Sequence, residues 1–207
     1  FFLLFASLGV LSYGSREVAR VRDDKTERSV LFWDLIIFKF IAVVCSYIAF
    51  FMFFHIKESK YTLIYMILSL NFLTSFLDLS WFYRGMEMFK QLSLRNTIVK
   101  LLGALLMFVL VKNENDLPLY IICIVVPGLV GNILLWGKAL KYVDRVPFRK
   151  INIARHLKPI LVFFIPAISV QIYHTVDKLM LQWILHDNFE NGYYDQAYKI
   201  ITILLTT

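Results

Sequence analysis

Five long apolar runs divide this chain, and charged residues bound each of them. A bilayer core of about 30 Å is crossed by roughly 20 apolar residues of α-helix, so runs of this length predict membrane-spanning helices. With 59% apolar and only 18% charged residues, a soluble enzyme is excluded, because its fold would leave much apolar surface in water. The sequence therefore predicts an all-α polytopic membrane protein. The complete runs cover residues 29–54, 61–83, 97–111, 117–137 and 159–185, and partial runs cover 1–11 and 192–207.

The loops between these runs differ sharply in their content of basic residues. One set holds 5, 4 and 7 Lys or Arg residues, in loops 13–28, 84–100 and 138–158 respectively. The alternate loops hold only Lys57, Lys60 and Lys112. Because basic residues accumulate in short cytoplasmic loops, the three basic loops are predicted to face the cytoplasm. The net charge of +7 is explained by these membrane edges, so no nucleic-acid partner is expected.

Sequence patterns of catalysis and metal binding are missing from the chain. The four His residues are scattered, and there is no HExxH, no Gly-rich phosphate loop and no GxSxG. Cys45 and Cys123 lie in apolar runs without CxxC spacing, which is typical of small core residues. We therefore expect no enzyme activity, no metal and no cofactor.

The fifth complete run carries the densest set of polar residues at membrane depth. An ionisable group there is costly unless it faces protein or water, so it marks a candidate site. Gln171, His174, Lys178 and Gln182 are spaced i, i+3, i+7 and i+11, which places them on one helical stripe, and Asp177 borders it. The stripe is predicted to line an aqueous cavity. The alternative is a dry hydrogen-bond network that only joins helices.

Other polar residues inside the runs admit both structural and functional roles. Asp195 and Lys199 can pair at i, i+4 or extend the polar lining of a cavity. Asp78 can cap a loop, pair with a neighbouring arginine or contact a substrate. Asp34 and Lys39 lie near the predicted cytoplasmic start of the first complete run, where a long Lys side chain can reach water.

The stretch 138–158 is predicted to connect two helical bundles, because it is long, basic and broken by proline. The predicted organisation is an N-terminal bundle over residues 1–137, this cytoplasmic connector, and the start of a C-terminal bundle over 159–207. Pro127 and Pro166 are predicted to break the runs that contain them. Since the chain does not begin with Met and ends within an apolar run, we expect a piece of a longer protein.

Four stretches of the sequence resemble the signature segments of a transporter family. They are ASLGVLSYGSREVARVRDDK (6–25), DLSWFYRGMEMFKQLSLRNTIVKLLG (78–103), HLKPILVFFIPAISVQIYHTVDKLML (156–181) and NGYYDQAYKI (191–200). In order and extent they are similar to Wzx-type flippases of lipid-linked oligosaccharides. These flippases form part of the polysaccharide transporter family, in one superfamily with multidrug extrusion (MATE) proteins. The matching polar positions are Arg16, Glu17, Asp78, Trp81, Arg84, Asp177 and Lys178.

The resemblance implies a fragment of a two-bundle MATE-like transporter of about 12 to 14 helices, from the end of the second helix to the start of the eighth. It implies that the bundles rock to expose a cavity alternately to each face. Such a protein moves an undecaprenyl-pyrophosphate-linked sugar unit across the bacterial inner membrane, which it crosses several times. The implied partners are this substrate, membrane lipids, a polysaccharide polymerase and a chain-length regulator.

A pyrophosphate that carries a glycan and an apolar tail needs cations in a wet cavity. The residues expected to bind it are Arg16, His174, Lys178, Gln171 and Gln182. The residues expected to couple the cycle or to form structural ion pairs are Asp177, Asp78, Asp195 and Lys199. The alternatives are a MATE-type exporter of cationic drugs driven by Na⁺ or H⁺, which should favour acidic cavity residues, and a membrane scaffold that transports nothing.

Overall fold

The computed structural model describes residues 2–7, 9–55, 62–113, 116–185 and 188–205, and within these ranges it contains helices and turns but no strand. Side chains are described at all of these positions except 55, 148, 174, 178, 179, 182, 185, 188–191 and 203–205. The helices are α1 (Phe2–Ser7), α2 (Val10–Arg20), α3 (Lys25–His55), α4 (Thr62–Leu77), α5 (Ser80–Gly85), α6 (Phe89–Leu110), α7 (Leu117–Ala139), the 3₁₀ turn η2 (Phe148–Lys150), α8 (Ala154–Leu185) and α9 (Asn188–Leu205).

Five segments of the described chain are long and apolar enough to cross a membrane. This finding confirms the prediction of an all-α polytopic membrane protein. The segments are Lys25–Phe54, Thr62–Gly85, Phe89–Leu110, Leu117–Ala139 and Ala154–Asp177.

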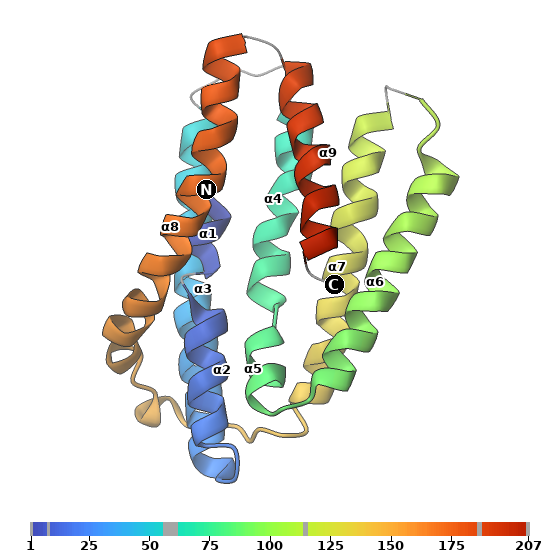
Figure 1. Cartoon of the computed structure of the whole chain (residues 1–207). Coiled ribbons are helices and arrows are strands. Elements are labelled where there is room, and N and C mark those ends of the chain that lie inside the picture. The colour runs from blue at the N-terminus through green and yellow to red at the C-terminus, as the bar shows by residue number, and fades with distance from the viewer. Residues whose placement is uncertain (1, 8, 56–61, 114–115, 186–187, 206–207) are drawn as a thin grey trace. The chain divides into compact units, whose positions relative to one another are not determined.

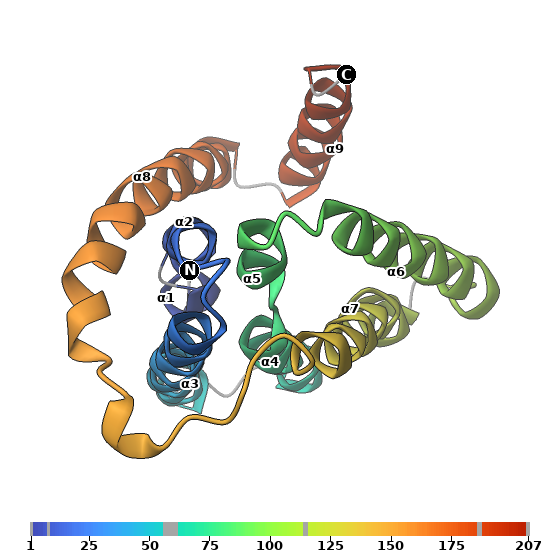
Figure 2. The same ribbon diagram turned by 90° about the horizontal axis from the view of Figure 1, so that it is seen from below.

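The chain divides into two compact units, Phe1–Phe164 and Ile165–Thr207, so that α8 begins in the first unit and ends in the second. Within the first unit, α2 packs against α5 and α3, and α7 packs against both α4 and α6. Figures 1 and 2 show α6 and α7 side by side from both directions. The turn that connects α5 to α6 lies at the same end of the unit as the connection from α2 to α3 (Figure 1).

Ion pairs and hydrogen bonds join the three basic loops at this end of the first unit. Arg22 Nη1 lies 2.6 Å from Glu87 Oε2, which joins the loop after α2 to the turn after α5 and raises the pKa of the Arg22 guanidinium. Lys25 Nζ lies 2.7 Å from Asp144 Oδ1 at the start of the connector. The loops that share one predicted side of the membrane therefore meet at one end of the fold.

The boundaries of two helices differ from the expected runs. The helix α6 begins at Phe89 rather than near Thr97, so Arg95 and Lys100 lie inside a membrane-spanning helix and not in a loop. The expected second run is not one helix, because α4 ends at Leu77 and α5 begins at Ser80.

The two predicted proline breaks are wrong, because α7 and α8 continue through Pro127 and Pro166. A proline inside a helix removes one backbone donor, here the partner of the Cys123 carbonyl. That carbonyl faces α6 at Gly103, where an added Cβ would lie 3.2 Å from its oxygen. The close helix contact that glycine permits encloses the freed carbonyl, and the helix persists.

Large aromatic side chains and close glycine contacts build the core at the end that carries the basic loops. Phe32, Trp81 and Phe82 are almost fully buried there. A Cβ atom added at Gly14 would lie 2.9 Å from the Trp81 ring, and one added at Gly85 would lie 2.5 Å from the Val18 side chain. The helices α2 and α5 therefore pack closely only because both glycines lack a side chain. This packing fixes α2, α3 and α5, which support the cavity described next.

Candidate functional site

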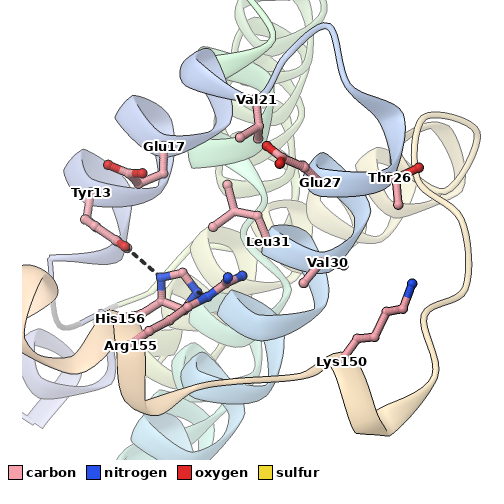
Figure 3. A pocket seen from close by; sticks show the side chains of 10 residues that line it. All are labelled: Tyr13, Glu17, Val21, Thr26, Glu27, Val30, Leu31, Lys150, Arg155 and His156. Carbon is pink, nitrogen blue, oxygen red and sulfur yellow. Dashed lines mark hydrogen bonds between the residues drawn. The ribbon is translucent and has the colours of Figure 1, made fainter.

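A cavity of about 550 Å³ lies in the first unit between α2, the start of α3 and the start of α8 (Figure 3). Its wall contains two carboxylates, two cations, an imidazole and two hydroxyl groups beside three aliphatic side chains. The lining residues are Tyr13, Glu17, Val21, Thr26, Glu27, Val30, Leu31, Lys150, Arg155 and His156. A wall with both donors and acceptors can bind a polar molecule that itself carries hydroxyl groups.

Asp34 is the centre of a buried network at this cavity. Its carboxylate is fully buried and lies 2.6 Å from Arg155 Nη2 and 3.1 Å from His156 Nε2. It also accepts the backbone N–H of Asn152 at 2.9 Å. A buried carboxylate is tolerated only where donors compensate for lost hydration. The Arg155 guanidinium and the Asn152 N–H do so here, with His156 Nε2 as a third donor in the tautomer that carries its proton on that nitrogen. The network therefore joins the start of α8 and the connector to α3.

Tyr13 extends this network to α2. Its hydroxyl oxygen lies 2.6 Å from His156 Nδ1 (Figure 3). Burial, and secondly the nearby carboxylate of Glu17, raise the pKa of the Tyr13 hydroxyl, which therefore stays protonated and can donate to the imidazole. With Nε2 directed to Asp34, one imidazole bridges α2 and α3.

Arg16, a predicted substrate residue, lies beside this cavity but does not line it. Its Nε lies 3.6 Å from Glu17 Oε1, and its guanidinium lies 5.7 Å from the centre of the Phe163 ring. The side chain is 61% exposed. Its charge thus remains accessible to solvent although a carboxylate is near.

Asp78, a predicted coupling or structural residue, stands at the break between α4 and α5. Its carboxylate accepts both the backbone N–H and the hydroxyl of Ser80, which caps the start of α5. The structure therefore gives Asp78 a capping contact, one of the roles that the sequence leaves open.

The carbonyl groups that end α4 find donors on neighbouring helices. A helix end at membrane depth needs such partners, because no water reaches it in lipid. Lys39, which is almost fully buried, donates from its ammonium group, and an amide and an indole supply the other donors. The bonds are Lys39 Nζ to Asp78 O at 2.6 Å, Trp136 Nε1 to Leu77 O at 2.9 Å, and Asn132 Nδ2 to Thr74 O at 2.8 Å.

The polar stripe predicted on α8 lies in the second unit. Gln171 is exposed, and Asp177 accepts a hydrogen bond from the Tyr194 hydroxyl at 3.1 Å. The side chains at 174, 178 and 182 lie outside the described residues, so the expected contacts of His174, Lys178 and Gln182 stay predictions. Asp195 is half-buried and Lys199 is exposed on α9.

Metal binding has no support in the described residues, which contain no group of three or more His, Cys, Asp or Glu side chains that could hold an ion. Cys123 is buried and Cys45 is exposed, and both are free thiols.

Sequence reasoning missed most of the Asp34 network. Asn152, Arg155 and His156 were expected in a connector, where basic residues need no specific partner. The one available signal was Asp34 itself, an acid inside an apolar run that requires a partner elsewhere in the chain.

Comparison with known proteins identifies relatives of the chain. Residues 1–206 match the family model described as "Polysaccharide biosynthesis protein". The chain is also 27% identical, over 189 residues, to a protein of Shigella dysenteriae named "Putative O-antigen transporter". The match covers 86% of this chain and 47% of that protein, so the chain spans about half the length of this curated relative. No solved structure matches.

Proposed function

The chain belongs to the polysaccharide biosynthesis protein family, and on this premise we propose that it is part of a flippase for lipid-linked oligosaccharides. The observation that carries the proposal is the family match over residues 1–206 of a chain with five segments able to cross a membrane. The substrate proposed is an undecaprenyl-pyrophosphate-linked repeat unit, and the membrane is the bacterial inner membrane. The protein moves this substrate by alternating access and is not an enzyme.

The cavity in the first unit supports a role in receiving the sugar part of the substrate. It lies at the end that carries the basic loops, which are predicted to be cytoplasmic, where the repeat unit begins its passage. Sugar hydroxyl groups both donate and accept hydrogen bonds. Glu27 and Lys150 offer an acceptor and a donor on the same wall, and no carboxylate of the described residues forms an ion pair with Lys150.

The pyrophosphate is proposed to be bound by cations. Lys178 and His174 of α8, with the amides of Gln171 and Gln182, retain this proposed role, and so does Arg16 of α2. Asp177 holds Lys178 or accepts a coupling proton. A polysaccharide polymerase and a chain-length regulator are the proposed protein partners.

The test uses the full-length protein in cells that lack their own transporter. The readouts are surface polysaccharide and the amount of lipid-linked repeat units that accumulate in the membrane. We expect Glu27→Gln and Lys150→Gln to reduce surface polysaccharide about tenfold, because each removes a charge-assisted hydrogen bond. Lys112→Gln, on the loop before α7, is the matched control and should retain activity. Full activity in both cavity variants would contradict a sugar-binding role for this cavity.

The same cells distinguish a drug exporter from a flippase. An exporter of cationic drugs would restore drug resistance, whereas a flippase restores surface polysaccharide. Resistance without polysaccharide would refute the proposed function.

A further inference from the structure

A second cavity, of about 470 Å³, lies between α5 and α6 in the first unit. It is lined by two cations, three small polar side chains and two apolar ones, and by no carboxylate. The lining residues are Arg84, Phe89, Leu92, Ser93, Asn96, Thr97 and Lys100. Among the described residues, neither Arg84 nor Lys100 forms an ion pair with a carboxylate. Two uncompensated cations beside hydroxyl and amide groups are the lining that a phosphoryl anion requires.

The polar members of this lining form one stripe along α6. Ser93, Asn96, Thr97 and Lys100 are spaced i, i+3, i+4 and i+7, which places them on one face of the helix. All four are exposed in the first unit. Leu102 and Leu106, which line a cavity between α6 and α7, lie on the opposite side of α6. The stripe is therefore not part of the α6–α7 contact.

Lys100 lies near the middle of a membrane-spanning helix. The 22 residues of α6 extend about 33 Å, close to the thickness of the bilayer core. Lys100 stands eleven residues after Phe89, about 16 Å from either end, which is farther than a lysine side chain reaches. An exposed ammonium at this depth is costly in lipid, so it faces a water-filled pathway or a bound anion.

A separate face of α6 carries the residues suited to lipid. Leu101 and Leu105 are each 60% exposed and Phe108 is 79% exposed. This face is about a quarter turn from the polar stripe. The same helix therefore presents lipid-compatible residues on one side and hydrophilic residues on another, as expected for a helix at the wall of an aqueous pathway.

We propose that Arg84, Asn96 and Lys100 form a phosphoryl-binding site on the pathway face of α5 and α6, which binds the diphosphate of the transported lipid. This inference rests on the proposed function for the identity of the ligand. Arg84 and Lys100 neutralise the diphosphate oxygens, and Ser93, Asn96 and Thr97 donate hydrogen bonds to them. The site consists only of residues of the first unit, whereas the stripe predicted on α8 consists of residues of the second unit.

The first part of the test measures water access and requires no transport. Single cysteines are placed at 93, 96, 97 and 100, and as controls at 101 and 105, in full-length protein with Cys45 and Cys123 replaced by serine and alanine. A membrane-impermeant maleimide should label the four stripe positions at least about tenfold faster than the controls, because a thiol reacts as its hydrated thiolate. Equal rates at all six positions would refute the pathway face.

The second part identifies the ligand in nanodiscs of phosphatidylcholine. Farnesyl pyrophosphate, as the probe, should slow labelling at position 93 by about tenfold or more, because a cysteine there leaves Arg84, Asn96 and Lys100 in place. The protection by this probe should be lost in the Lys100→Gln variant. It should be retained in Lys90→Gln, which changes a cation of α6 that does not line the cavity. Protection by added phosphatidylglycerol but not by the probe would overturn the proposal in favour of a membrane-lipid site. No protection by either ligand would overturn it altogether.

These readouts separate the site from the proposed function. If the wild-type protein fails to restore surface polysaccharide while the probe still protects position 93, the proposed function fails and the phosphoryl site stands. If polysaccharide is restored but the probe protects nothing, this site fails and the proposed function stands.

Discussion

The clearest quantitative prediction concerns the ion pair between Asp34 and Arg155. Asp34 is fully buried, and its Oδ2 lies 2.6 Å from Arg155 Nη2. Removing one partner of a buried pair typically costs about 3–5 kcal/mol, because the other charge is left without compensation. Since the Arg155 side chain is 48% exposed, water restores part of its hydration, and we expect about 2–3 kcal/mol for Asp34→Asn. The asparagine keeps an oxygen acceptor for the backbone N–H of Asn152.

The assay is a double-mutant cycle on the full-length protein, with the free energy of unfolding measured by SDS titration in mixed micelles. Asp34→Asn, Arg155→Gln and the double variant should give a coupling energy of about 1–2 kcal/mol. The matched control is the exposed pair of Lys25 and Asp144, with side chains 51% and 63% exposed, for which we expect about 0.5 kcal/mol or less. Equal coupling energies in the two cycles would refute the reasoning that burial makes the Asp34 pair strong.

Three further predictions follow from the packing and hydrogen bonds of the first unit. Lys39→Met should lower the free energy of unfolding by about 1–3 kcal/mol, since a carbonyl at the end of α4 loses its donor; an unchanged value in the same SDS titration would contradict this. Gly85→Ala should destabilise by about 1–3 kcal/mol because its Cβ would overlap Val18. Gly137→Ala should cost nothing in that assay, since an added Cβ there meets no other part of the described chain within 4 Å. The backbone N–H groups of residues 112 and 113 donate to the Asp116 carboxylate and lower its pKa. The stabilisation that these two bonds give is complete above about pH 4 and is lost as pH falls through the lowered pKa. Hydrogen exchange at those two amides should then accelerate beyond the intrinsic pH dependence, and Asp116→Asn should show no such step.

The sequence predicted the membrane-spanning helices well because length and hydropathy are local properties. The expected run 117–137 is almost the whole of α7 (Leu117–Ala139). The start of α6 was missed because Phe89–Asn96 mixes apolar and polar residues, which in an isolated segment resembles a loop. Within the fold, Ser93 and Asn96 of this stretch face a cavity, and the helix extends through them.

The break between α4 and α5 had no local signal. Neither Asp78 nor Leu79 is a proline or a glycine, and the segment 62–85 as a whole is apolar enough to cross a membrane. The break persists because donors from α3 and α7 form hydrogen bonds with the carbonyls that it frees. The spacing of residues along one helix gives no information about donors on another helix. Pro127 is the converse case, because its local signal predicted a break that helix packing overcame.

The candidate site was harder to predict because its contacts join distant parts of the chain. Asp34 and the residues that donate to it are more than 100 positions apart. Residues 138–158 were expected as a connector, yet Asp144, Asn152 and Arg155 of this stretch bond to residues of α3. The basic composition was noted correctly, but composition does not distinguish a cation that pairs with a buried carboxylate from one that faces water.

That distinction decides which cations of the first unit are available to an anionic substrate. Arg28 donates to the carbonyl of Tyr142 and Lys39 to that of Asp78, and both side chains are almost fully buried. Burial keeps an anion from both groups, and moving either side chain outward would leave these oxygen acceptors unsatisfied. Lys100 is exposed and has no carboxylate partner among the described residues, so an anion there replaces only water. Substrate contacts are therefore expected at cations that the fold leaves unpaired. The paired cations instead join the helices and loops that position those contacts.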